Sequence, residues 1–220
     1  MPERHLRLAA ADEPMILLLL AVAAGLLAGL GRAWWGGRRL QFPALRLEWL
    51  VLVAVIPQVS AFYLPVVRDI FSDWVVAIGL VTSQLCLLTF VWLNRRQPAF
   101  WLMGLGLFLN FLVITLNGGF MPISPEMASR LVPTVLPEAW AIGSRFGTSK
   151  DIILPIHETQ LWVLSDRFFW STPFTSYRVA FSLGDVGIAL GVFLWLWALG
   201  RSNLTHLQEI NLEKLKTIPE

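Results

Sequence analysis

Five long apolar stretches dominate the chain, separated by shorter polar connections. A helix crosses the hydrocarbon core of a bilayer with roughly 20 apolar residues, and about 17 to 25 are accepted. By that measure the sequence predicts membrane-spanning helices at residues 15–31, 49–67, 74–93, 99–116 and 182–199. We interpret the first as a retained helix, because no small-x-small cleavage site leads from it into a soluble domain. The predicted fold class is all-α, an integral membrane bundle of about five transmembrane helices.

Basic residues alternate between the connections and predict how the bundle is oriented. The first and third connections carry most of them, namely Arg32, Arg38, Arg39, Arg46, Arg95 and Arg96. The second connection carries Arg68 against Asp69 and Asp73. Because Lys and Arg concentrate in cytoplasmic loops, we expect the N-terminus outside and the C-terminus in the cytoplasm. Arg4 and Arg7 on the outer side are the one exception.

This orientation divides the chain into five parts. They are an N-terminal leader (1–14), helices one to four (15–119), an extracytoplasmic segment (120–181), helix five (182–200) and a cytoplasmic tail (201–220). In the outer segment, Ser124 followed by Pro125 predicts a helix start. Residues 137–143 and 157–168 are candidates for two more short helices. The segment is rich in aromatic residues, so we expect it to be ordered and to lie against the outer membrane face or cap the bundle.

Composition narrows the function classes. The chain is 56% hydrophobic and 15% charged, with 11 Trp, whereas soluble domains carry about 25% charged residues. A net charge of +2 provides no broad basic surface for nucleic acid. With the single Cys86, no intrachain disulfide forms, and His157 has no companions at zinc-ligand spacing. We therefore expect no cofactor and no metal; the expected partners are membrane lipids and other membrane proteins.

Three amides lie near the middle of predicted spans, at Gln58, Gln84 and Asn110. Polar groups are costly in hydrocarbon, so each needs a partner. The favoured interpretation is hydrogen bonding between helices; the alternative is a polar path or ligand pocket. No charged residue accompanies them at that depth, which disfavours a transporter. A further polar group follows the fourth span, where Asn117, Gly118 and Gly119 before Pro122 are typical of a helix stop.

Two carboxylates are candidates for chemistry. Asp166 precedes Arg167, and Asp185 lies in the first turn of the last span, three residues after Ser182. Two carboxylates that share a proton can activate water for peptide hydrolysis. The structural alternative is a capping box of Ser182 and Asp185, with Asp166 in an ion pair with Arg167 or another basic group. The sequence leaves both open, and we favour the structural one.

From Met15 onward the chain resembles a family of small bacterial membrane proteins known only as a domain of unknown function. The resemblance rests on Gln58, on Asn110, on the run 116–122, on Leu164-Ser165-Asp166, and on Phe181-Ser182-Leu183-Gly184-Asp185. It implies a polytopic protein of the bacterial plasma (inner) membrane and assigns no activity.

The last quarter is also similar to the end of lipoprotein signal peptidases. Ser165-Asp166-Arg167 and the run 181–191 carry this resemblance, which implies that Asp166 and Asp185 form a catalytic pair. Val163 and Ser182 stand where that family has Asn, and Gly184 where it has Ala.

Three functions follow from these observations. The leading hypothesis is a non-enzymatic membrane protein, an accessory subunit or a bundle that binds a lipid or protein through its aromatic outer segment. The rival is an outer-facing aspartyl membrane peptidase that uses Asp166 and Asp185. A small transporter is the third.

Overall fold

The structure, a computed structural model, describes residues 13–37, 40, 42–63, 71–147, 149–171 and 177–199. In these residues the chain is mostly helical, with six α-helices and two small sheets of two strands each. The sheets correct the expectation of an all-α protein. One of them pairs segments about thirty residues apart in the chain, β1 with β2, and local periodicity carries no signal for such a pairing.

All five predicted apolar stretches contain a helix, and residues 64–67 of the second lie outside the described residues. The helices are α2 (Glu13–Trp35), α3 (Trp49–Tyr63), α5 (Asp73–Leu93), α6 (Pro98–Leu116) and α8 (Leu183–Ala198). Among the described residues, α2, α5 and α6 are long and apolar enough to cross a membrane, and α3 and α8 are shorter apolar helices. The predicted leader lies outside the described residues except for positions 13 and 14, which begin α2, and the predicted tail lies outside them entirely.

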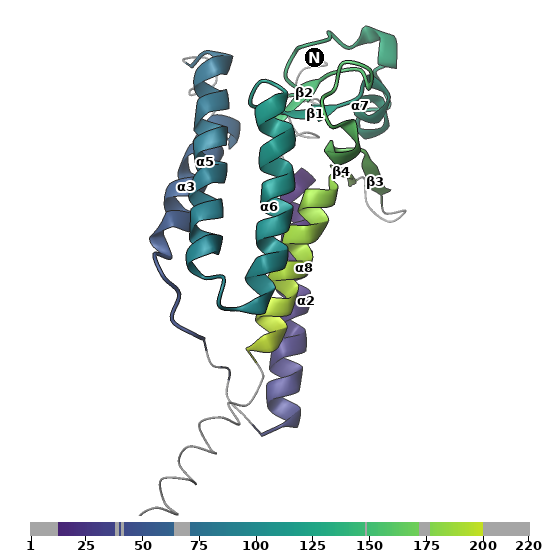
Figure 1. Cartoon of the computed structure of the whole chain (residues 1–220). Coiled ribbons are helices and arrows are strands. Elements are labelled where there is room, and N and C mark those ends of the chain that lie inside the picture. Colours follow the sequence, from purple (N-terminus) through teal and green to yellow (C-terminus); the bar gives the residue numbers. More distant parts are fainter. Residues whose placement is uncertain are drawn as a thin grey trace, which may run out of the picture.

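The helices stand side by side, and the outer segment gathers at one end of them (Figure 1). α3 packs against α5, α5 against α6, α6 against α8, and α8 against α2. The N-terminal end of α2 and the C-terminal end of α6 lie at the end that carries the outer segment, and the turn between α5 and α6 lies at the opposite end.

Glycines set the spacing around α8. A Cβ at Gly191 would lie 2.5 Å from Met103 Cγ and 2.7 Å from Met103 N on α6. On the other side, a Cβ at Gly29 of α2 would lie 2.5 Å from the Leu196 carbonyl oxygen of α8. Small residues allow helix backbones to approach closely in a membrane, so α8 is held tightly between α6 and α2.

The predicted mid-span amides are placed between helices. Gln58 Nε2 donates to Ser83 Oγ, and Ser83 Oγ donates to the Ala54 carbonyl at 2.6 Å, which joins α3 to α5 one turn before Pro57. Gln84 is buried, and its Oε1 has no hydrogen-bond partner in the described part of the chain. Asn110 contacts α8 and belongs to the site described below.

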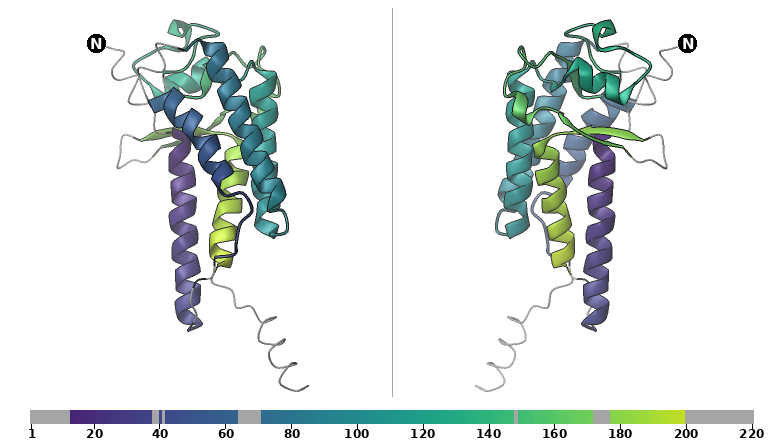
Figure 2. Two further views of the ribbon diagram at one scale, coloured as in Figure 1. Left: turned by 90° about the vertical axis from the view of Figure 1, so that its left-hand side faces the viewer. Right: turned by 90° about the vertical axis from the view of Figure 1, so that its right-hand side faces the viewer.

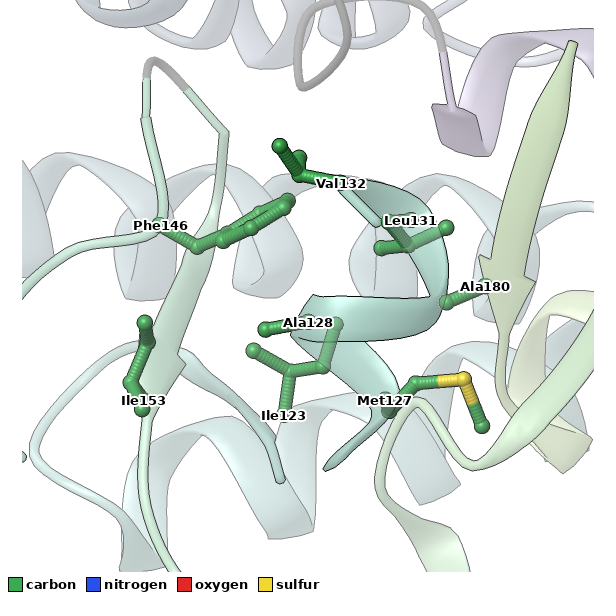
Figure 3. Close-up of a cluster of buried hydrophobic side chains, with 8 residues drawn as sticks. All are labelled: Ile123, Met127, Ala128, Leu131, Val132, Phe146, Ile153 and Ala180. Carbon is green, nitrogen blue, oxygen red and sulfur yellow. The ribbon is translucent and has the colours of Figure 1, made fainter. Parts of the chain in front are cut away.

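The outer segment has a small core of its own. It contains β1 (Met121–Ile123), α7 (Pro125–Leu131), β2 (Asp151–Ile153), β3 (Phe168–Ser171) and β4 (Arg178–Phe181). β1 and β2 are parallel, and β3 and β4 are antiparallel. Apolar side chains from β1, α7, β2 and β4 meet around Phe146 (Figure 3). The hairpin of β3 and β4 lies across the N-terminal end of α2 (Figure 2).

Two further clusters fix this segment to the helices. Phe120 and Ile152 pack on Val76 and Ala77 of α5. Met121 packs with Leu80 of α5 and with the end of α6. The described residues of the outer segment therefore pack against the bundle.

Of the three short helices predicted in the outer segment, one is confirmed. α7 begins after Ser124, whose hydroxyl accepts from the Met127 N–H at 3.2 Å. Residues 137–143 contain a single 3₁₀ turn, η1 (Pro137–Ala139). The helix predicted at 157–168 is wrong: a 3₁₀ turn, η2 (Trp162–Leu164), and the start of β3 occupy this stretch. The backbone of Gln160 bonds to the Asn117 side chain instead of to its own chain neighbours.

The glycine contacts generate a stability prediction. We expect Gly191→Ala to lower the free energy of unfolding by about 1–3 kcal/mol, the usual cost of overpacking, because its Cβ meets the Met103 backbone. Gly79→Ala is the matched control, since nothing lies within 4 Å of its Cβ. Unfolding of both variants in mixed micelles measures the difference. Equal stability of the two would contradict the tight contact.

Candidate functional site

The first turn of α8 is tied to the side of α6 by hydrogen bonds. Asp185 Oδ2 accepts from the Ser182 backbone N–H at 3.0 Å, and Ser182 Oγ accepts from the Asp185 N–H at 3.0 Å, which completes a capping box. Asn110 Nδ2 of α6 donates to Asp185 Oδ1 at 2.8 Å. Ser182 Oγ also lies 2.9 Å from Asn110 Oδ1. The amide of Asn110 is thereby satisfied inside an apolar helix.

Gly184 makes this contact possible. A Cβ at Gly184 would overlap the Asn110 side-chain amide and lie 2.7 Å from the Gly106 carbonyl oxygen. Any side chain here would push the first turn of α8 away from α6. Glycine therefore occupies position 184 because there is no space for a side chain, and not because of a chemical role.

A second polar cluster lies in the outer segment around Lys150. Lys150 Nζ is 2.6 Å from Asp166 Oδ2 and 3.3 Å from Asp151 Oδ1. The three side chains are 12%, 3% and 3% exposed in the order Lys150, Asp166, Asp151. β1 brings them together, because the Met121 N–H donates to the Lys150 carbonyl and the Asp166 N–H donates to the Pro122 carbonyl.

The charges in this cluster do not balance. Asp151, Asp166 and the nearby Asp185 surround one lysine. Burial lowers the pKa of Lys150, but the three carboxylates outweigh it and hold the pKa above its ordinary value. A lysine acts as a general base only when neutral, and the raised pKa of Lys150 favours its charged form.

The pKa of Asp166 is shifted upward, whereas the pKa of an ordinary ion-paired acid is lowered. Burial raises its pKa well above the ordinary value and Lys150 opposes this, while Asp151 and Asp185 add to it. Burial and the neighbouring acids outweigh the ion pair, since one ammonium cannot compensate three carboxylates in a water-poor site. Asp166 Oδ1 is buried and has no hydrogen-bond partner in the described structure.

The structure engages the two predicted acids with separate partners. Both oxygens of Asp185 bond to Ser182 and Asn110, and Asp166 Oδ2 bonds to Lys150. In the described part of the chain no hydrogen bond joins Asp166 to Asp185. The basic partner of Asp166 is Lys150 and not the adjacent Arg167: Arg167 is exposed and its guanidinium lies 4.5 Å from the Trp162 ring centroid.

Asn117 links the end of α6 to the outer segment. Its Nδ2 donates to the Val113 and Gln160 carbonyls at 2.7 and 2.9 Å, and its Oδ1 accepts from the Gln160 N–H at 2.9 Å. Gly118 and Gly119 follow with φ of +77° and +89°. The Gly119 N–H bonds to the Ile114 carbonyl, which closes the helix in the manner of a Schellman motif.

Lys150 and Asp151 were not predicted from the sequence. Their signal was visible: Lys150 is the only lysine before residue 214, and three apolar residues follow the pair. No group of three or more His, Cys, Asp or Glu side chains suited to a metal occurs among the described residues. The His157 side chain is 80% exposed beside Glu158.

Comparisons with known proteins place the chain by sequence alone. A model described as "Family of unknown function (DUF5317)" matches residues 43–197, which run from before α3 almost to the end of α8. No curated protein and no solved structure matches the chain. The resemblance to signal peptidases therefore receives no support from relatives.

The Lys150 cluster predicts a large effect from removing its one cation. Lys150→Met leaves the Asp151 carboxylate buried without a counter-charge and removes the hydrogen-bond donor to Asp166, and we expect a loss of about 3–5 kcal/mol in the free energy of unfolding. Arg178→Met, which removes an exposed cation, is the control. Adding Asp166→Leu to Lys150→Met should restore part of the loss in a double-mutant cycle. Strictly additive losses would show that the two side chains are uncoupled.

Asp166 also predicts a pH dependence. Its pKa is raised, so the folded protein keeps a proton that the unfolded chain loses above about pH 4. Stability should be fully present below that pH and fall as the pH rises through the folded pKa of Asp166. Unfolding of Asp166→Asn should lack this slope. Glu126→Gln, an exposed acid, should keep it; an unchanged slope in Asp166→Asn would contradict the assignment.

Proposed function

The chain belongs to this family of unknown function (DUF5317), and from its geometry we propose a non-enzymatic integral membrane protein, an accessory subunit that binds another membrane protein through its outer segment. The proposed topology has five spans in a bacterial plasma membrane, with the N-terminus outside. The steps below give the support for each part.

The distribution of arginine supports the orientation. Arg32 lies in the last turn of α2, and Arg95 and Arg96 lie in the turn between α5 and α6, away from the outer segment (Figure 1). Arg46, near the start of α3, is held to that turn because its backbone bonds to Asn94. Since basic residues mark the cytoplasmic side, the outer segment faces outward.

The two shorter helices are compatible with five spans. α8 has 16 residues, about 24 Å at 1.5 Å per residue, which is less than the roughly 30 Å hydrocarbon core. Its first turn meets α6 at Asn110, well before the end of α6 at Leu116. β4 contacts α2, and β1 and η2 contact α6, so protein rather than lipid flanks the missing length.

The single observation that supports the non-enzymatic function is that the polar groups of this region bond structural elements to one another. An aspartyl pair must hold one water between two carboxylates. Here Asp185 caps and docks α8, and Asp166 binds a fixed cation. Each acid holds two elements together. The polar groups of this region thus support a rigid platform.

The platform leaves apolar side chains exposed on its far side. Leu136 is 70% and Ile142 is 51% exposed, on the two sides of η1. Beneath them, Val135 and Trp140 pack on the core around Phe146. Figure 1 places the chain between α7 and β2 at the end of the molecule beyond the helices. Exposed apolar groups on a rigid support are typical of a protein contact.

The contact predicts a surface-dependent complex. In native membranes, affinity purification of the wild-type chain should recover one membrane protein in a fixed ratio. We expect Leu136→Glu with Ile142→Glu to abolish that recovery, because charged groups cannot be buried at the contact. Thr134→Glu with Ala139→Glu, exposed positions in the same stretch, is the matched control.

Two results would overturn the proposal. One is purification of the wild-type chain alone under conditions that preserve known complexes. The other is cleavage of a membrane-embedded peptide by the wild-type protein that is lost in both Asp166→Asn and Asp185→Asn while both variants remain folded. The second result would establish the peptidase instead.

A further inference from the structure

The turn η2 exposes three consecutive apolar side chains. Leu161 is 45%, Trp162 is 41% and Val163 is 44% exposed. Leu161 adopts a left-handed conformation with φ of +53°, which a branched residue rarely takes without support. The flanking residues Gln160 and Leu164 provide that support through the bundle, so the turn is held in place with its apolar side chains outward.

Contacts on either side fix the depth of η2. Gln160 is bonded through both backbone groups to Asn117 at the end of α6. Leu164 packs on the cluster of Leu80, Val113 and Ile114. Leu80 is seven residues into α5, about 10 Å from the start of the helix at 1.5 Å per residue. The turn therefore lies alongside the outer ends of α5 and α6 and not beyond them.

The neighbouring surfaces match this depth. Leu116, in the last turn of α6, is 53% exposed, and Leu105, eleven residues earlier in the same helix, is 55% exposed. These side chains face lipid in a membrane-spanning α6. The apolar surface of η2 lies at the same end of α6 as Leu116 and in contact with that helix, so it adds to the apolar surface at this depth.

Arg167 adds a charge at the edge of this turn. Its guanidinium lies 4.5 Å from the centroid of Trp162 and 5.5 Å from that of Phe168. The residue is exposed, so stacking orients the cation without covering it. Trp rings prefer the headgroup boundary of a bilayer, and Arg pairs with phosphate in two-point geometry. The combination matches the amphiphilic boundary of a lipid leaflet.

We propose that residues 161–163 and Arg167 form an anchor that inserts into the outer leaflet, with Leu161, Trp162 and Val163 among the upper acyl chains and Arg167 at the lipid phosphates. This inference rests on the proposed span of α6 and specifies a second contact, separate from the protein contact at Leu136 and Ile142. A protein covering the same turn would have to displace the lipid beside α6.

Spin labels at three positions test the anchor in the purified full chain. Labels at Val163, Leu136 and Leu105 are introduced in a Cys86→Ser background and reconstituted in vesicles of phosphatidylcholine and phosphatidylglycerol. Collision with oxygen reports lipid, and collision with a water-soluble nickel chelate reports solvent. We expect the ratio of oxygen to nickel collisions at Val163 to lie above that at Leu136 and below that at Leu105. Arg167→Gln should shift Val163 toward the solvent value.

The outcomes separate the anchor from the proposed function. A Val163 label as solvent-accessible as Leu136, with Leu105 in lipid, overturns the anchor alone. A Val163 label shielded from both reagents indicates a second copy of the chain and also overturns it. A Leu105 label in water overturns the membrane span itself. If Cys86→Ser does not fold, quenching by brominated lipid, compared between the wild type and Trp162→Phe, gives the same test: the anchor fails if the loss of Trp162 leaves the quenching unchanged.

Discussion

The hydrogen bonds of Asn110 determine the height at which the last helix begins. An amide in an apolar helix must find partners, and Asn110 finds them in Ser182 and Asp185. Asn110 lies six residues before the end of α6, about 9 Å along the axis. α8 must therefore start below the outer end of α6, and the glycines at its contacts permit the approach. The chain that precedes α8 must therefore run beside the helices, and this determines where the outer segment lies.

That position explains how a group of charges can be buried beside the ends of apolar helices. Lys150, Asp151 and Asp166 are enclosed by strands that rest on α5 and α6. Three nearby carboxylates against one ammonium favour retention of a proton. A cluster with this balance holds chain segments together through charge-assisted hydrogen bonds. The stability of the cluster depends on all of its side chains. This is a structural requirement, and it differs from what catalysis requires of a pair of acids.

Features encoded by neighbouring residues were predictable from the sequence, and contacts between residues far apart in the chain were not. The apolar runs predicted the five helices because burial in lipid requires unbroken apolar length, and Ser124 with Pro125 predicted α7 through its cap. The capping box of Ser182 and Asp185 was visible at a spacing of three residues. The pairing of Lys150 with Asp166 joins two segments that both bond to β1. The helix predicted at 157–168 does not form, because the backbone of Gln160 bonds to the side chain of Asn117. No periodicity encodes these contacts.

The late position of α8 in the chain has a consequence for biosynthesis. Ala180 completes the apolar core of the outer segment, and Ser182 and Asp185 are the partners that Asn110 requires. All three leave the ribosome after the segment they complete. Until α8 has been made, the amide of Asn110 lacks these partners and the core of the outer segment lacks β4. A chain cut short before residue 180 would therefore lack both the partners of Asn110 and the last strand of that core.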